Sequence, residues 1–457
     1  MLKINPSIFK AYDIRGIYNQ DFDDELAYLL GLAYVKLRQS DPDFLPDKKL
    51  QIAVGADMRL SSPALKKNLI RGLIEAGADA IDLGTVSTPT FYFAVGHYNY
   101  FGGIMISASH NPKEWNGFKM VRSRGIPISG ETGINFLKDL VLNNKFLAAE
   151  IPGKLIENKN ALAEETSSAL SSVNLNNIKP FKIVADTANG MGASYLETLF
   201  AKLPGELIPL NFKLDGTFPA HEADPLKEEN LEELKEAVKQ QKADLGIATD
   251  GDGDRIFFTD NNGETINPAI IRGLLAKIFL IDKPGSKIGY DVRPGKITSD
   301  LILENGGQAI ITRVGHSLIK EQMLKENIYF AGESSGHFYL QGAAGCFEYP
   351  GEIILKLLTL FSSIKESVAD YIQQFKKYYS SGEINRQVTD KEVVFQKIKQ
   401  KYTAGRLNEL DGISINYPDF WFNVRGSNTE PLIRLNLEAI SPEIMEEKRD
   451  EVLELIK

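Results

Sequence analysis

The feature that most constrains the fold is an irregular threefold repeat of apolar runs. In each copy a first run ends in aspartate, at Asp57, Asp186 and Asp291. A second run follows about 20 to 25 residues later, and a third run then leads into a polar loop. Runs that alternate with helical patterns predict α/β domains with largely parallel sheets, whose active loops lie at the carboxyl ends of strands. A solenoid is excluded because the repeats are far too long.

An amphipathic helix is predicted between the first two runs. Ser61 or Ser62 can cap this helix, Pro63 suits its first turn, and Gly77 ends it. Its apolar stripe is formed by Leu65, Leu69, Leu73 and Ile74.

The pattern changes after about residue 380. Residues 432–438, LIRLNLE, alternate between apolar and polar side chains from Ile433 onward, which predicts a strand with one solvent-exposed face. Ser441 and Pro442 begin a terminal helix. A chain of 457 residues is long enough for three or four domains. We predict three related α/β/α domains with mixed sheets and a smaller C-terminal α+β domain, around one central cleft. The predicted domains cover residues 1–153, 154–258, 259–371 and 372–457.

Composition narrows the range of partners. The net charge is −9 and no long basic block is present, so nucleic acid is a poor candidate. Cys346 is the single cysteine, which excludes a disulfide within the chain and fits a reducing cytoplasm. The N-terminus lacks a signal-peptide core, and the apolar segment 270–281 is interrupted by Arg272 and Lys277. We therefore expect a soluble cytoplasmic protein that binds neither nucleic acid nor membrane.

The first candidate for chemistry is a hydroxyl group at the end of a buried strand. The apolar residues 103–106 lead into the loop 107–112, SASHNP, which contains Ser109. A strand end fixes the direction of a nucleophile while the loop admits substrate. The alternative is an ordinary turn built by Asn111 and Pro112.

Three aspartates separated by glycines form the strongest local signal. Asp250, Asp252 and Asp254 can wrap hard oxygen ligands around one divalent cation, and three carboxylates leave positions open, which suits Mg²⁺ shared with a phosphate oxygen. An EF-hand is disfavoured, because its sixth and twelfth positions would be Arg255 and Asn261. A solvated acidic turn is the alternative.

The loop 425–431 has the composition of an anion-binding site. Arg425 offers a bidentate fork, and Ser427, Asn428 and Thr429 add directional donors, with Arg434 downstream as a second fork. The alternative is a polar turn with a surface arginine.

Further polar groups lie near the predicted ends of strands. Glu333, Ser335 and His337 are suited to bind hydroxyl groups, and His316 lies in another loop of the same domain. Lys119 follows the serine loop closely enough to donate a proton or pair with a phosphate, although alone it would be interpreted as a surface lysine. A nucleophile, a metal site, a hydroxyl-binding loop and a phosphate site together indicate phosphoryl transfer on a polyol.

These motifs resemble those of the α-D-phosphohexomutases, most closely the bacterial phosphomannomutase/phosphoglucomutase branch. The resemblance extends from residues 11–16, AYDIRG, to the loop 425–431. It implies reversible transfer of phosphate between the 6- and 1-hydroxyls of mannose or glucose phosphate. It also implies a phosphoserine at Ser109, bound Mg²⁺, and a hexose 1,6-bisphosphate as primer and intermediate. Small hexose phosphates are then the expected partners of a monomer or weak dimer.

The resemblance also implies a role for each candidate residue. The metal ligands would be Ser109, Asp250, Asp252 and Asp254. The catalytic centre would contain Ser109, His110, Lys119, Arg255 and His337, with Lys119 and His337 in proton transfer. Substrate would be bound by Tyr12, Arg15, Arg293, Gly315, His316, Glu333, Ser335, Arg425, Ser427, Asn428, Thr429 and Arg434.

The chain departs from the family pattern at three places. Arg293 replaces a lysine found in some members, Ala56 replaces an arginine, and residues 221–225, HEADP, differ from the usual run. Three alternative functions stay open at this point: a phosphoglucosamine mutase, against which the loop 425–431 speaks, a serine- and metal-dependent sugar phosphatase, and a non-catalytic sugar-phosphate-binding protein.

Overall fold

The computed structural model describes residues 4–143, 146, 149–426 and 432–456. The chain forms two compact units, each built from two stretches of sequence. Unit 1 contains Met1–Thr265 and His337–Ala369, and unit 2 contains Ile266–Gly336 and Asp370–Lys457. Each unit is described by itself below.

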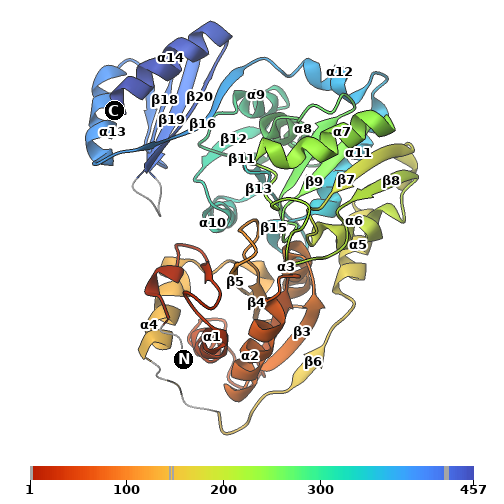
Figure 1. Cartoon of the computed structure of the whole chain (residues 1–457), viewed down its shortest axis with the longest axis vertical. Coiled ribbons are helices and arrows are strands. Elements are labelled where there is room, and N and C mark those ends of the chain that lie inside the picture. Colours follow the sequence, from red (N-terminus) through yellow and green to blue (C-terminus); the bar gives the residue numbers. More distant parts are fainter. Residues whose placement is uncertain (1–3, 144–145, 147–148, 427–431, 457) are drawn as a thin grey trace. The chain divides into compact units, whose positions relative to one another are not determined.

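The first sheet of unit 1 has six strands in the order β1-β5-β4-β2-β3-β6. The strands β4, β2, β3 and β6 are parallel, whereas β5 runs antiparallel to both β4 and β1. Helices α1 and α2 pack on one face and α3 on the other, so the sheet is buried on both sides (Figure 1). The elements are β1 (Ile14–Ile17), α1 (Asp24–Gln39), β2 (Gln51–Ala56), α2 (Ser62–Glu75), β3 (Asp79–Thr85), α3 (Thr88–His97), β4 (Gly102–Ile106), β5 (Trp115–Arg122), α4 (Asn135–Asn143) and β6 (Leu155–Glu157).

The second sheet of unit 1 has the order β10-β9-β7-β8, with β10 antiparallel to β9 and the others parallel. Its elements are α5 (Ala161–Ser171), β7 (Phe181–Asp186), α6 (Gly192–Phe200), β8 (Gly205–Leu210), α7 (Glu232–Gln241), β9 (Leu245–Thr249) and β10 (Ile256–Asp260). Unit 1 also contains the antiparallel pair β14 (Phe338–Gln341) and β15 (Cys346–Glu348), followed by α11 (Pro350–Ser363).

Unit 2 begins with parallel strands in the order β12-β11-β13. Their elements are α8 (Pro268–Asp282), β11 (Lys287–Asp291), α9 (Lys296–Glu304), β12 (Gln308–Thr312), α10 (His316–Glu326) and β13 (Ile328–Gly332). The sequence repeat is therefore confirmed in space. In all three cases the strand that ends in or just before aspartate lies between the second and third strands of its repeat, and all three are parallel.

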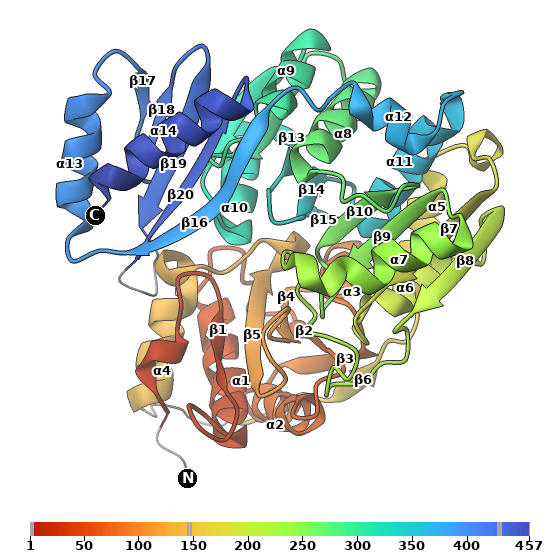
Figure 2. The ribbon, with the colours of Figure 1, turned by 45° about the horizontal axis from the view of Figure 1, so that its top comes forward.

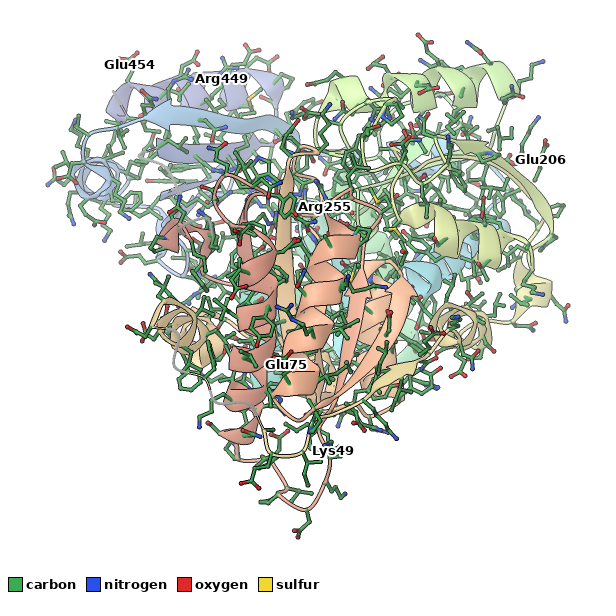
Figure 3. The ribbon with its side chains drawn as sticks, turned by 60° about the horizontal axis from the view of Figure 1, so that its bottom comes forward. Lys49, Glu75, Glu206, Arg255, Arg449 and Glu454 are labelled. Atoms are coloured by element: carbon green, nitrogen blue, oxygen red, sulfur yellow. The ribbon has the colours of Figure 1, made fainter. Side chains whose placement is uncertain are left out.

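The C-terminal part of unit 2 is an antiparallel sheet in the order β16-β20-β19-β18-β17. Helices α13 and α14 cover its apolar face, and β16 is an edge strand (Figure 2). Charged side chains of α14 such as Arg449 and Glu454 lie on its outer side (Figure 3). The elements are α12 (Val368–Gln373), which joins unit 1 to this part of the chain, β16 (Tyr379–Gln387), α13 (Lys391–Lys401), β17 (Arg406–Asn408), β18 (Ile413–Asn416), β19 (Phe420–Gly426), β20 (Leu432–Ala439) and α14 (Pro442–Leu455).

The predicted fold class, α/β domains with mixed sheets before an antiparallel C-terminal domain, is confirmed. The predicted helix is α2, with Ser61 as its N-cap and Gly77 just beyond its end at φ +93°. The predicted boundaries at 153, 258 and 371 stay predictions, although β6 pairs with β3 two residues beyond the first boundary and β10 spans the second. Among the described residues, no helix has the length and apolar character needed to cross a bilayer.

Candidate functional site

Ser109 lies three residues beyond β4, where the chain turns away from the sheet. Its backbone adopts φ +52°, a left-handed conformation that non-glycine residues hold only when their surroundings enforce it. The amide N–H of Ser109 donates to the hydroxyl of Ser107 at 2.8 Å. Its side chain is buried and donates to Oδ2 of Asp250 at 2.6 Å, across 141 residues of sequence. The serine loop and the acidic loop therefore meet, as residues that share one metal ion would have to.

A fully buried arginine three residues before α2 shapes the serine loop. Arg59 donates from Nη2 to the carbonyl oxygens of Ser109 (2.7 Å) and Asn111 (2.6 Å). It donates from Nη1 to the carbonyls of Pro112 (2.7 Å) and Trp115 (3.0 Å). One guanidinium group therefore fixes three carbonyl groups of the loop that carries the candidate nucleophile and one at the start of β5.

The three aspartates occupy the turn between β9 and β10, and all three are buried. Lys119, on β5, donates from Nζ to Oδ2 of Asp252 and Oδ2 of Asp254, each at 2.6 Å. Asp252 also accepts a hydrogen bond from Thr88 at the start of α3, at 2.6 Å. The acidic turn of the second sheet is thus fixed by side chains from the first.

Burial and mutual repulsion shift the protonation of these groups. Burial, and then the negative charges of Asp254 and Asp252, raise the pKa of Asp250 to about 8. Burial also disfavours charge at Asp254, but Lys119 and His337 hold the pKa of Asp254 well below its usual range. Burial likewise opposes charge at Lys119, yet the two aspartates it contacts hold its pKa well above its usual value. The turn therefore concentrates more negative charge than Lys119 neutralises.

This arrangement fits a divalent cation. One oxygen from each of Asp250, Asp252 and Asp254 lies within 4.8 Å of the others. Oδ1 of Asp252 is buried and has no hydrogen-bond partner among the described residues. Hard carboxylate oxygens with lone pairs to spare are the ligands that Mg²⁺ prefers. The residues present therefore fit the predicted metal.

The other predicted catalytic residues of unit 1 also lie around this turn. Nδ1 of His110 is 3.2 Å from Oγ of Ser109, and burial, with the charges of Arg255 and Arg15, lowers the pKa of His110 well below its usual value. A neutral imidazole therefore faces the hydroxyl. Nε2 of His337 is 3.1 Å from Oδ1 of Asp254, and Nε of Arg255 (Figure 3) is 3.8 Å from Asp250.

The predicted residues near the chain start are partly buried. Arg15, on β1, donates from Nη1 to the side chain of Asn111 at 2.6 Å and from Nη2 to Asp13 at 2.6 Å. It is thereby tied to the serine loop. Tyr12 precedes β1 and is half-buried.

A second group of predicted residues is found in unit 2. Oε1 of Glu333 accepts hydrogen bonds from the backbone N–H of Gly315 (3.1 Å) and from Arg293 (3.2 Å). Gly315, at φ +122°, is the N-cap of α10, whose first residue is His316. Ser335 is buried in the loop after β13. The loops after β11, β12 and β13 therefore bring these predicted residues to one end of their sheet.

The predicted phosphate-binding arginines of unit 2 contact an acid that sequence reasoning missed. Arg425 and Arg434 both donate to the carboxylate of Glu383, at 2.9 and 3.1 Å. Nε of each arginine is buried and has no hydrogen-bond partner in the described part of the chain. The predicted residues Ser427, Asn428 and Thr429 lie outside the described residues.

Arg59 and Thr88 were also missed. The spacing of Asp57 and Arg59 after a strand is a weak signal, because the role of Arg59 depends on carbonyl groups 50 or more residues away. Nothing in the local sequence links Thr88 to Asp252.

The sequence matches four family descriptions in chain order. "Phosphoglucomutase/phosphomannomutase, alpha/beta/alpha domain I" matches residues 6–147, domain II of the same family matches 162–263, and domain III matches 267–378. The C-terminal domain of that family matches 383–455. The matches together cover most of the chain.

Full-length relatives and a solved structure agree with these matches. A phosphomannomutase of Vibrio cholerae is 37% identical over 459 residues, covering 98% of both chains. A phosphomannomutase of Methanocaldococcus jannaschii is 38% identical, covering 98% of this chain and 97% of its own. The crystal structure of a phosphoglucomutase/phosphomannomutase family protein from Burkholderia thailandensis superposes with a TM-score of 0.88 at 30% identity, covering 100% of this chain and 98% of that one.

Proposed function

The chain belongs to the phosphoglucomutase/phosphomannomutase family and is a hexose-phosphate mutase, and we propose that its phosphoryl group is carried by Ser109. The observation that carries this proposal is the 2.6 Å hydrogen bond from Oγ of Ser109 to Asp250 in the cation-binding turn. A hydroxyl at that position can hold a phosphoryl group beside a bound cation.

In the proposed reaction the phosphoserine ester bond breaks and a new ester bond forms to a free hydroxyl of mannose or glucose phosphate. The product is a hexose 1,6-bisphosphate, which turns over and returns its other phosphoryl group to Oγ of Ser109. Phosphate has then moved between the 6- and 1-hydroxyls. A hexose 1,6-bisphosphate also primes an enzyme whose Ser109 is unphosphorylated.

Each residue near Ser109 has a proposed task. Mg²⁺ held by Asp250, Asp252 and Asp254 would neutralise charge on the transferring oxygens. The attacking hydroxyl loses its proton to a nearby base, and the proton returns to the leaving oxygen. Lys119 and His337 are proposed for these transfers, because each contacts the aspartates. Lys119 is proposed as a proton donor, since its raised pKa keeps it charged, and His337 as the group that accepts the proton.

Substrate binding is proposed for the residues of unit 2 and for the start of the chain. Glu333 and Ser335 would bind sugar hydroxyls, with support from the Glu333 contacts to Arg293 and Gly315. Arg425, with Ser427, Asn428, Thr429 and Arg434, would bind the phosphate that does not react. The remaining proposed binding residues are Tyr12, Arg15, which donates to Asn111 of the serine loop, and His316, which follows Gly315.

The proposal is tested by mapping the phosphoryl group. Mass spectrometry of enzyme incubated with glucose 1,6-bisphosphate is expected to find phosphate on Ser109. Ser109→Ala should abolish both the label and mutase turnover, whereas Ser107→Ala, the matched loop serine, should keep the label. A label on any other residue, or full turnover by Ser109→Ala, would contradict the proposal.

The sugar is tested with a coupled assay. Mannose 1-phosphate, glucose 1-phosphate and glucosamine 1-phosphate are compared with a trace of bisphosphate primer. We expect turnover of mannose or glucose phosphate, and dominant turnover of glucosamine 1-phosphate would contradict this. Release of free phosphate in excess of isomerised sugar phosphate would identify a phosphatase instead.

A further inference from the structure

An acidic side chain occupies the predicted phosphate-binding position of unit 2. Arg425 and Arg434 are direct partners across β19 and β20, so two like charges face each other on one side of the sheet. Glu383 lies between them and accepts from Nη2 of Arg425 (2.9 Å) and Nη1 of Arg434 (3.1 Å). Asn436 adds a contact to the same carboxylate at 3.3 Å.

The backbone of β16 is built to aim this carboxylate. Ser380 pairs with Glu438 and Glu383 pairs with Asn436, so β16 contains one extra residue relative to β20 between these two pairs. This is a β-bulge, and Gly382 within it adopts φ +67°. The bulge is fixed by hydrogen bonds to Ser380 and Ser381. Bulges commonly re-aim a side chain beside a functional site.

The charges favour a larger anion than this one carboxylate. Burial opposes charge at Glu383, but Arg425 and Arg434 outweigh it and lower the pKa of Glu383, so the carboxylate is ionised at neutral pH. Two guanidinium groups are therefore hydrogen-bonded to one carboxylate, and Arg293 adds positive charge and Asp411 negative charge nearby. The two arginines match a phosphate dianion in charge and in donor geometry, and the buried Nε of each has no partner among the described residues.

We propose that the Glu383 carboxylate occupies the phosphate site when no substrate is bound. There it holds Arg425 and Arg434 in place, and it competes with the substrate's phosphate for these two arginines. This inference rests on the proposed function, in which Arg425 binds the phosphate that does not react. The Glu383 side chain is 28% exposed, against 10% for Arg425, so the acid has open space into which it can turn. Arriving phosphate displaces the carboxylate, and the returning carboxylate speeds release.

A purely structural role for Glu383 gives the opposite sign. If the acid served only to hold the two arginines, its removal would let them repel each other and would weaken phosphate binding. If it competes with phosphate, its neutralisation should tighten binding. The direction of the change therefore separates the two roles.

The test is equilibrium binding of inorganic phosphate to the full-length chain, wild type against Glu383→Gln. We expect the Kd for phosphate to fall about tenfold, the effect of removing one charge about 5 Å from a dianion in a solvated site. The KM for the hexose phosphate should fall with it, and kcat should fall because release is slower. Glu409→Gln is the matched control, since it removes an acid paired with Lys399 in the same domain and should leave both constants unchanged.

Two further variants separate the possible failures. Glu383→Asp keeps the charge but shortens the side chain, and its phosphate affinity should lie between those of the wild type and Glu383→Gln. If Glu383→Gln does not fold, the comparison of Glu383→Asp with the wild type is the test. An unchanged or weaker affinity in these variants overturns the inference. Arg425→Gln should weaken phosphate binding at least tenfold, and if it does not, the phosphate site of the proposed function fails as well.

Discussion

Replacement of Arg59 should separate the stability of the serine loop from its catalytic geometry. In Arg59→Met, four carbonyl groups lose a charged donor, and the buried Asp57 loses an ion pair of 3.2 Å. A hydrogen bond to a charged group contributes about 1.5–3 kcal/mol, but these bonds share one side chain and are not additive. We expect the free energy of unfolding to fall by about 4 kcal/mol, which leaves an ordinary domain folded at low temperature.

The catalytic effect follows from the backbone of Ser109. Its left-handed conformation persists because Arg59 clamps the carbonyl on its C-terminal side while Ser107 binds its amide. Without that clamp the residue relaxes and its Oγ leaves Asp250. A displacement of about 1 Å at a reacting atom costs about 100-fold in rate, so kcat should fall by that factor while KM stays within about twofold.

Arg38 supplies the matched control. It is equally buried, donates to the carbonyl of Phe101 at 2.9 Å, and pairs with Asp41 and Asp43, all away from the serine loop. Arg38→Met should lose comparable stability in urea denaturation, yet keep the kcat of the coupled mutase assay. Millimolar methylguanidinium should partly restore turnover to Arg59→Ala. Equal kcat in Arg59→Met and Arg38→Met would refute the proposed clamp.

Three other outcomes are expected. Dialysis against EDTA should abolish mutase turnover and Mg²⁺ should restore it, whereas turnover that survives chelation would contradict the metal site at Asp250, Asp252 and Asp254. Lys119→Met should lower kcat at least about 100-fold with an unchanged circular dichroism spectrum, because it removes a charged donor to two of these aspartates. Burial raises the pKa of Glu165 to about 7 from an ordinary 4.5, so the wild type should lose stability relative to Glu165→Gln as the pH rises from 4.5 to 7. The loss should be about 3 kcal/mol in urea titrations, and a constant difference would contradict it.

The fold and the site were most predictable from the sequence where the residues that determine a feature lie close together along the chain or follow successive strands. Parallel strands bring their carboxyl ends to one edge, so three strands that end in polar loops predict where functional groups gather. The same holds for α2, whose cap, proline and apolar stripe all lie within one segment. The strand β20 was also predictable, since its burial alternates as its sequence does from Ile433 to Leu437, although Glu438 is buried.

Contacts made by single side chains over long distances were not predictable. Arg59 acts through carbonyl groups, which every residue carries, so no residue type marks its partners. Glu383 lies in a polar edge strand without clear periodicity, and the bulge at Gly382 shifts which side of the sheet its side chain faces. In both cases the backbone conformation determines which side chains meet, and this conformation cannot be predicted from the residue types alone.

The two charge clusters explain how a protein of net charge −9 can bind an anionic substrate. At physiological ionic strength exposed charges are screened beyond about 8 Å, so the net charge of the chain has little influence on a bound phosphate. The local excess of one sign of charge at each site decides which ligand is bound. In unit 1 three buried aspartates outnumber Lys119 and suit a cation, while in unit 2 Arg425 and Arg434 outnumber Glu383 and suit a dianion. Each cluster also holds charges of the opposite sign, Lys119 and Arg255 in unit 1 and Glu383 in unit 2. These groups limit repulsion before a ligand binds, and they must share or release their partners afterwards.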